Sequence, residues 1–89
     1  MKITYSKIFL KHFYKAPEKI QFALERSVEI FRHDQFNRSL RNHALKGKWE
    51  GFRSIDVTAN WRALYRELEG GEIEWVEFVE IGTHSQLYK

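Results

Sequence analysis

The sequence contains no cysteine. It therefore forms no disulfide bonds and offers neither thiolate metal ligands nor a cysteine nucleophile, which fits a reducing compartment such as the cytoplasm. No apolar run approaches the roughly 20 residues of a transmembrane helix. The N-terminal residues 1–5 also lack the long apolar stretch of a secretory signal peptide. We accordingly expect a cytoplasmic protein with no membrane partner.

The chain does contain enough apolar material for one hydrophobic core. It has 89 residues, of which 43% are hydrophobic and 16% are aromatic. A chain of this length is typical of one small domain. Since no repeat, linker or low-complexity tract interrupts it, we assign residues 1–89 to a single domain.

Charge is distributed unevenly along the chain. Residues 1–66 hold 14 Lys and Arg against 6 Asp and Glu, a net charge of +8, whereas residues 67–89 hold one Lys against 6 Glu, a net charge of −5. Residues 38–66 alone carry 7 basic against 2 acidic side chains, or +5. A concentrated cationic stretch suits a polyanion such as RNA or DNA, although a solvated surface of mixed charge gives the same pattern.

The first third of the sequence predicts a short strand and two helices. Residues 2–5 alternate between polar and apolar side chains, as in a strand. Ser6 is a suitable N-cap for a helix over residues 6–15. Pro17 ends that helix and suits the first turn of a second one, which runs to about residue 33. The buried face of the second helix is marked by apolar residues at every third or fourth position: Ile20, Leu24, Val28 and Phe31.

The remainder predicts a loop and then three strands. Residues 34–50 lose the helical period and form a loop, with one helical turn around residues 36–40. The strands are expected over residues 52–57, 60–68 and 72–81, with a glycine hairpin turn at 69–71 joining the last two. The fold class is therefore α+β, in the order β-α-α-β-β-β, with two helices packed on an antiparallel sheet.

One face of this sheet is a candidate binding surface. Within the first strand of the meander, Arg53 shares a face with Ile55, while Asp56 lies on the other face. In the next strand, Arg62 alternates with Trp61, which we expect to be at least half-buried. Because the helices cover one face, the opposite face is free to form a shallow cationic surface.

The sequence lacks the common motifs of metal and nucleotide sites. It has no phosphate-binding GxxxxGK[ST] loop, no GxGxxG and no HExxH, and its four histidines show no metal-ligand spacing. We therefore expect no metal and no cofactor. His84 follows the last predicted strand directly, where a side chain is held on a fixed frame, and His43 lies in the loop.

The side chains near the strand ends are sufficient to cleave RNA. Cleavage without a metal requires a group that takes a proton from the 2′-OH, cationic donors for the phosphorane and a group that protonates the 5′-oxygen. Histidine can act as acid or base near neutral pH, and arginine binds phosphate with a forked set of donors. The candidates are His43, Arg53, Asp56, Arg62, His84 and Tyr88.

Four segments, in this order, carry a family resemblance. They are Leu40-Arg41-Asn42-His43-Ala44-Leu45-Lys46-Gly47, Trp49-Glu50-Gly51-Phe52-Arg53, Asn60-Trp61-Arg62-Ala63-Leu64-Tyr65 and Ile81-Gly82-Thr83-His84-Ser85-Gln86-Leu87-Tyr88. With the β-α-α-β-β-β order, they make the chain resemble the RelE/ParE toxin superfamily, and most closely its YafQ-type branch. The resemblance extends over nearly the whole chain. It implies a RelE-like fold.

The resemblance also implies an activity and a set of catalytic residues. Members of this branch are type II toxins, metal-independent endoribonucleases that cut mRNA in the ribosomal A site and are neutralised by a cognate antitoxin. By their motif positions, His84 corresponds to the general acid or base, Tyr88 to the aromatic that orients the RNA, and His43 to the loop histidine. Arg62 corresponds to the arginine that binds the scissile phosphate, and Arg53 to a basic position on the preceding strand.

Two positions depart from the branch pattern. Asp56 replaces a further histidine, and Asn60 replaces an aspartate. We include Asp56 among the catalytic candidates, although an ordinary aspartate, with a pKa of about 3.9, is a poor base at neutral pH. The alternative is a structural ion pair between Asp56 and Arg53 or Arg62. The residues expected to bind RNA are Arg41, Lys46, Lys48, Arg53 and Trp61.

Two further functions are compatible with the same resemblance. A gyrase poison of the ParE type would not need His84. A catalytically weakened module that binds RNA or an antitoxin would keep the surface and lose the cleavage, and the substitutions at Asp56 and Asn60 would fit such a loss.

Overall fold

The computed structural model describes residues 1–69 and 73–88. Three helices and five strands follow one another, with two 3₁₀ turns, η1 and η2, in the central loop. The elements are β1 (Lys2–Tyr5), α1 (Lys7–Lys15), α2 (Glu18–His33), η1 (Arg38–Leu40), β2 (His43–Ala44), η2 (Gly47–Trp49), β3 (Arg53–Asp56), β4 (Trp61–Leu68), β5 (Trp75–Thr83) and α3 (His84–Leu87).

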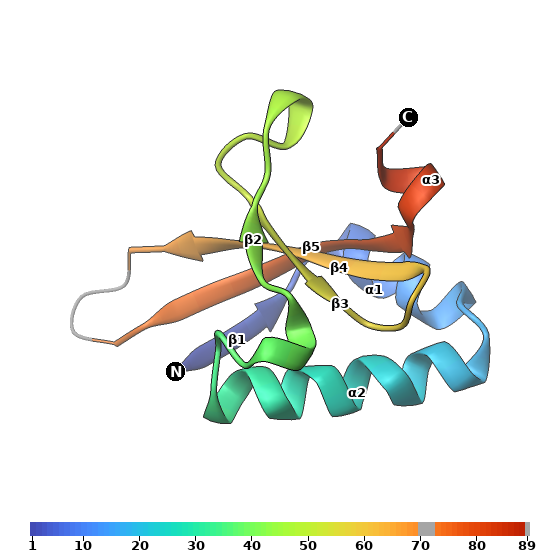
Figure 1. Cartoon of the computed structure of the whole chain (residues 1–89), viewed down its shortest axis with the longest axis horizontal. Helices are drawn as coiled ribbons and strands as arrows, with labels where there is room; N and C mark the ends of the chain where they lie inside the picture. Colours follow the sequence, from blue (N-terminus) through green and yellow to red (C-terminus); the bar gives the residue numbers. More distant parts are fainter. Residues whose placement is uncertain (70–72, 89) are drawn as a thin grey trace.

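The five strands form one sheet in the order β1-β5-β4-β3-β2. The pair β1–β5 is parallel and the other pairs are antiparallel. Figure 1 shows α2 lying across one face of the sheet, while the loop between β2 and β3 (residues 45–52) and α3 project from the opposite face. The expected α+β class, with two helices packed on a sheet, is confirmed, although the sheet expected to be antiparallel contains one parallel pair.

Helix α1 is fixed to the sheet at its first turn. The Ser6 hydroxyl accepts a hydrogen bond from the Phe9 N–H (3.0 Å) and donates one to the Val79 carbonyl of β5 (3.1 Å). The predicted N-cap is therefore confirmed, and the same side chain anchors α1 to β5. This places Phe9 in the core, where its ring centroid lies 6.0 Å from that of Phe78.

Helix α2 supplies most of the remaining core. It follows Pro17 as predicted, and its buried side chains include Ile20, Leu24, Val28 and Phe31. The Phe31 ring packs against Tyr65 of β4, with the centroids 4.9 Å apart. The Tyr65 hydroxyl in turn accepts a hydrogen bond from the Asn42 side-chain amide (2.7 Å). The core thus holds the start of the loop that leads to His43.

A register shift in the β4–β5 pair sets which side chains of β5 face the core. Leu64 pairs with Glu80 and Tyr65 pairs with Phe78, so that Val79 is an extra residue on β5. Such a bulge interrupts the alternation of side chains between the two faces of the sheet. It allows Phe78 and Ile81, which are three residues apart, both to enter the core.

The structure corrects several predicted boundaries. The predicted strands 52–57, 60–68 and 72–81 become β3, β4 and β5, of which β5 continues to Thr83. The predicted order lacked β2 and α3, and it did not foresee that β1 pairs in parallel. The turn expected around 36–40 is η1. Gly70 and Gly71 of the predicted hairpin turn 69–71, and Glu72 at the start of the predicted strand 72–81, lie outside the described residues.

No helix in the described ranges is long and apolar enough to cross a membrane.

Candidate active site

A cavity of about 390 Å³ lies between residues of β2, β4 and α3, and Figure 1 shows α3 projecting from the sheet face opposite α2. Four of the five predicted catalytic residues line the cavity, although they come from three different elements: His43 from β2, Arg62 from β4, His84 from α3 and Tyr88 from the end of α3. Arg41 and Leu45 complete the lining. The fold therefore brings together side chains that lie as far apart in the sequence as positions 41 and 88.

Arg62 is the buried cation of this cavity, with 8% of its surface exposed. Its Nη1 donates to three carbonyls of the β3–β4 turn and β4, those of Thr58 (2.9 Å), Ala59 (3.1 Å) and Trp61 (3.1 Å). Its Nε lies 3.1 Å from Oδ1 of Asp56. Within the described part of the chain, Nη2 makes no hydrogen bond, so this donor is available to an anion in the cavity.

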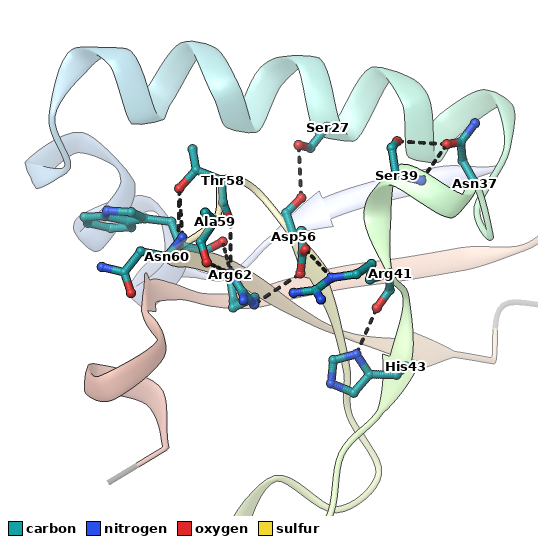
Figure 2. Close-up of polar contacts among 11 residues, drawn as sticks. Ser27, Asn37, Ser39, Arg41, His43, Asp56, Thr58, Ala59, Asn60 and Arg62 are labelled. Carbon is teal, nitrogen blue, oxygen red and sulfur yellow. Dashed lines mark hydrogen bonds and ion pairs between the residues drawn. The ribbon is translucent and has the colours of Figure 1, made fainter.

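Asp56 lies between two guanidinium groups, as Figure 2 shows. Its Oδ2 accepts a hydrogen bond from Nε of Arg41 (2.7 Å). Its Oδ1 is in ion-pair contact with Arg62, although the two groups are not aligned as a hydrogen bond. The ion-pair alternative is therefore confirmed for Arg62. A pair with Arg53 was wrong, and Arg41 takes that place.

Arg53 lies on the other face of the sheet. It is opposite Tyr65 in the β3–β4 register, and Tyr65 packs against α2. Since opposite residues of an antiparallel pair share a face, Arg53 points toward the helix-covered side. There its Nε donates to Oδ1 of Asn42 (2.8 Å) and its guanidinium lies 5.4 Å from the Phe36 ring centroid. Arg53 does not line the cavity.

The other predicted RNA-binding residues have different positions. Lys46 and Lys48 are exposed on the 45–52 loop, whose first residue, Leu45, lines the cavity. Trp61 is half-buried, as expected, and packs against the core on the side away from Arg62. It lines a separate hollow with His12 and Leu87.

His43 is exposed, and one of its ring nitrogens is fixed by the backbone. Nδ1 lies 2.8 Å from the carbonyl oxygen of Arg41. Because a carbonyl can only accept, Nδ1 carries the proton of this bond. In the neutral ring, Nε2 then has a free lone pair, which is the state that a general base requires.

His84 is held by the way α3 begins. Thr83 and Gln86 form a capping box, in which the Thr83 hydroxyl accepts from the Gln86 N–H and the Gln86 side chain accepts from the Thr83 N–H. The His84 N–H donates to the Asn60 carbonyl of the β3–β4 turn (2.9 Å). Leu87 is buried, and its carbonyl accepts from the Trp49 indole (2.9 Å). These contacts tie α3 to both neighbouring loops.

Tyr88 packs against His84, with the ring centroids 4.7 Å apart. Its hydroxyl is buried and has no hydrogen-bond partner among the residues that the structure describes. Buried hydroxyls are normally bonded, and the exceptions occur at functional sites. The Tyr88 side chain also lines the cavity that holds His84 and Arg62.

Arg41 is the residue whose part in the site the sequence did not reveal. We expected it only to bind RNA, yet it contacts both Asp56 and His43. Its backbone is left-handed, with φ 44° and ψ 45°. No sequence signal marks an arginine for this conformation, which normally favours glycine or asparagine.

The family profile described as a bacterial toxin of a type II toxin-antitoxin system, YafQ, matches residues 1–89. The chain belongs to the YafQ toxin family. The resemblance seen in the sequence is thereby confirmed. No curated protein sequence matches the chain.

Solved structures of YafQ and related toxins share this fold. YafQ from *E. coli* strain BL21(DE3) is 22% identical with a TM-score of 0.78, and the match covers 99% of this chain and 98% of that one. The *E. coli* DinJ-YafQ toxin-antitoxin complex gives 23% identity and a TM-score of 0.76, with 99% and 97% covered. The YoeB/ParE toxin from *Agrobacterium tumefaciens* gives 18% and 0.75, with 94% and 99% covered. The RelE-like fold expected from the sequence is therefore confirmed.

Within the described residues of this YafQ-family chain, no three His, Asp or Glu side chains form a group that could hold a metal ion. The polar groups that line the cavity are instead two arginines, two histidines and a tyrosine. Such a set can bind a phosphate and transfer protons.

Proposed function

We propose that this chain is a ribosome-dependent, metal-independent endoribonuclease that cleaves mRNA in the A site of the 30S subunit and so inhibits translation. The observation that carries the proposal is the single cavity lined by His43, Arg62, His84 and Tyr88. Each step of RNA transesterification has a suitable side chain in this set.

In the proposed reaction, Nε2 of His43 takes the proton of the 2′-OH. The 2′-oxygen then forms a bond to phosphorus while the bond between phosphorus and the 5′-oxygen breaks, and His84 gives the departing 5′-oxygen its proton. The products are a 2′,3′-cyclic phosphate and a 5′-hydroxyl. Arg62 stabilises the phosphorane through its free Nη2, and the Tyr88 hydroxyl orients the RNA. Proton transfer and charge stabilisation by these four side chains require no cofactor.

Two partners follow from this proposal. The mRNA on the ribosome would contact the basic residues around the cavity, Arg41, Lys46 and Lys48, and the sequence adds Arg53 and Trp61 as further RNA-binding candidates. A cognate antitoxin would neutralise the toxin in the cytoplasm. Its expected form is an acidic or amphipathic segment that competes with RNA for the cationic surface. The DinJ-YafQ toxin-antitoxin complex supports an antitoxin partner.

The proposal is tested by induced expression in a bacterial host. The wild-type chain is expected to arrest growth and to create new 5′ ends in cellular mRNA that carry a hydroxyl. His84→Ala should lower the cleavage rate about 100-fold or more, since a positioned acid contributes roughly that factor. His33→Ala is the matched control, because His33 is exposed on α2 and contacts only Glu29 within the described chain.

Three results would contradict this proposal. If His84→Ala is as toxic as the wild type and gives identical RNA ends, His84 has no part in the mechanism. Toxicity with a DNA-damage response and without new RNA ends would indicate a gyrase poison. Ribosome binding without any cleavage would indicate a weakened binding module.

A further inference from the structure

Arg41 has an unusual backbone for its residue type. It is the one non-glycine residue with a positive φ in the part of the chain that the structure describes. Left-handed backbone is costly for a residue with a Cβ and persists only where surrounding contacts hold it. The conformation of Arg41 therefore requires an explanation from its contacts.

Arg41 is held at both its side chain and its carbonyl. Its Nε donates to Oδ2 of Asp56 (2.7 Å), 15 residues further along the chain, and its carbonyl accepts from Nδ1 of His43 (2.8 Å). Figure 2 shows both bonds, with Arg41 between the carboxylate and the imidazole. The left-handed residue ends η1 and leads into β2, which brings its own carbonyl beside the His43 ring.

Asp56 is itself a fixed point. It is the last residue of β3, and its carbonyl accepts a hydrogen bond from the Ser27 hydroxyl of α2 (3.2 Å). Of its two carboxylate oxygens, Oδ2 binds Arg41, and Oδ1 lies 3.1 Å from Nε of the buried Arg62. Asp56 therefore connects the sheet and α2 to the exposed Arg41 side chain, and through the Arg41 backbone to His43.

These contacts determine which tautomer His43 adopts. A neutral imidazole can carry its proton on either ring nitrogen, and the hydrogen bond of one nitrogen selects the state of the other. The Arg41 carbonyl accepts from Nδ1 and so selects the Nδ1–H form. Both carboxylate oxygens of Asp56 face guanidinium groups, so its position suits holding Arg41 rather than relaying a proton.

We propose that Arg41 is a positioning residue that holds neutral His43 as its Nδ1–H tautomer, and that Asp56 acts through Arg41 and carries no proton in the reaction. The consequence for catalysis rests on the proposed ribonuclease function, whereas the tautomer itself does not. In a general base, an orienting group of this kind decides whether the correct nitrogen faces the substrate.

The experiment combines ring-nitrogen NMR of ¹⁵N-labelled protein with cleavage kinetics on ribosomes carrying mRNA. The wild-type His43 ring, once neutral, is expected to show mainly the Nδ1–H form. Arg41→Ala should lower the share of that form and reduce kcat at least about tenfold, because fewer molecules present Nε2 as base. A rise in KM would report the separate loss of an RNA contact. Arg41→Lys, which can still reach Asp56, should restore part of both the tautomer share and kcat.

Arg32→Ala is the matched control. It also removes an exposed arginine from a carboxylate, that of Glu29 at 3.9 Å, but on the α2 side of the molecule. It should leave the His43 signals and kcat unchanged. Unchanged signals of His12, His33 and His84 in Arg41→Ala would show that the variant has folded.

The outcomes separate the proposals. A wild-type His43 that is mainly Nε2–H overturns the inference, as does an Arg41→Ala variant with an unaltered tautomer. A shifted tautomer with unchanged kcat overturns the catalytic consequence. If the wild-type protein cleaves no RNA, the proposed function fails, and the spectra still decide the tautomer because they need no substrate.

Discussion

At the scale of single residues, Arg62 and His43 each use some of their side-chain nitrogens to hold the fold and leave another nitrogen free to contact a ligand. Arg62 uses Nη1 for three carbonyls and Nε for Asp56, which leaves Nη2 for the cavity. His43 uses Nδ1 for a carbonyl and keeps Nε2. A side chain fixed in this way loses little conformational entropy when a phosphate or hydroxyl binds. The folded chain therefore fixes the geometry of these groups before any ligand binds.

Tyr88 provides a prediction in which stability and activity change in opposite directions. Its buried hydroxyl has no partner in the described chain, and such a group costs about 1 kcal/mol or more. Tyr88→Phe should therefore raise the free energy of unfolding by about 1 kcal/mol, as measured by urea denaturation. Cleavage should fall about fivefold, because the ring still packs on His84 but the hydroxyl no longer bonds to RNA.

Tyr14→Phe is the control for this pair of measurements. Tyr14 is on α1 and 70% exposed, so loss of its hydroxyl should change neither stability nor cleavage. A Tyr88→Phe variant that is less stable than the wild type would mean that the hydroxyl has a partner in the free protein.

The sequence predicted some of these residues and not others, for a physical reason. His84 and Arg62 lie in or directly after strands, where the period fixes the direction of a side chain, and both reach the cavity. We predicted correctly that Arg53 shares a face of the sheet with Ile55. The helices cover that face, so Arg53 does not reach the cavity. The bond between Arg41 and Asp56 joins a loop to a strand, and no local pattern reports such a contact.

At the scale of elements, the position of His84 depends on how closely α3 approaches β5. Gly82 allows this approach. A Cβ at that position would lie 3.1 Å from Oε1 of Gln86 and 3.3 Å from Cδ2 of Leu87. Neither neighbour is free to move, because Gln86 accepts from the Thr83 N–H (2.8 Å) and Leu87 is buried. A methyl group would therefore displace the helix itself.

We expect Gly82→Ala to reduce cleavage about tenfold or more, since misplacing a catalytic group by a fraction of an ångström weakens proton transfer. The free energy of unfolding should fall by only about 1 kcal/mol, as at other overpacked sites. Ribosome assays and urea denaturation measure the two effects. Ser85→Ala, an exposed substitution on α3, should leave both unchanged. Full activity of Gly82→Ala would show that His84 does not depend on this packing.

The periodic patterns in the sequence predicted most helices and strands, but not the bulge in β5 or the short helix that follows it. The core residues of α2 follow the helical period and were found directly. In β5, by contrast, Phe78 and Ile81 break the period of two because Val79 is an extra residue, and a bulge has no local signature here. Helix α3 has only four residues, too short for periodicity to reveal, and its capping box becomes meaningful only beside the end of β5.

At the scale of the whole molecule, three glutamates of the acidic stretch lie at the end of the sheet away from the cationic cavity. Strand β4 begins beside α3, where Trp61 pairs with Thr83, and ends where Leu68 pairs with Trp75. Figure 1 shows that these are opposite ends of the sheet. The glutamates near the second end, Glu67, Glu69 and Glu74, line a hollow there. These three glutamates thus lie at the end of the sheet away from the cationic cavity, which favours one orientation toward a polyanion.

This arrangement predicts how affinity for ribosomes carrying mRNA depends on salt. The logarithm of the association constant should fall linearly with the logarithm of salt concentration, because phosphate contacts release counterions. Lys48 is exposed on the 45–52 loop, whose first residue lines the cavity, so Lys48→Ala should make the slope shallower by roughly 0.7–0.9, the value for one phosphate contact. The measurement uses a His84→Ala background, which prevents cleavage during titration. Lys19→Ala, which removes an exposed lysine from α2, should leave the slope unchanged. An affinity that does not vary with salt would mean that the cationic face is not where RNA binds.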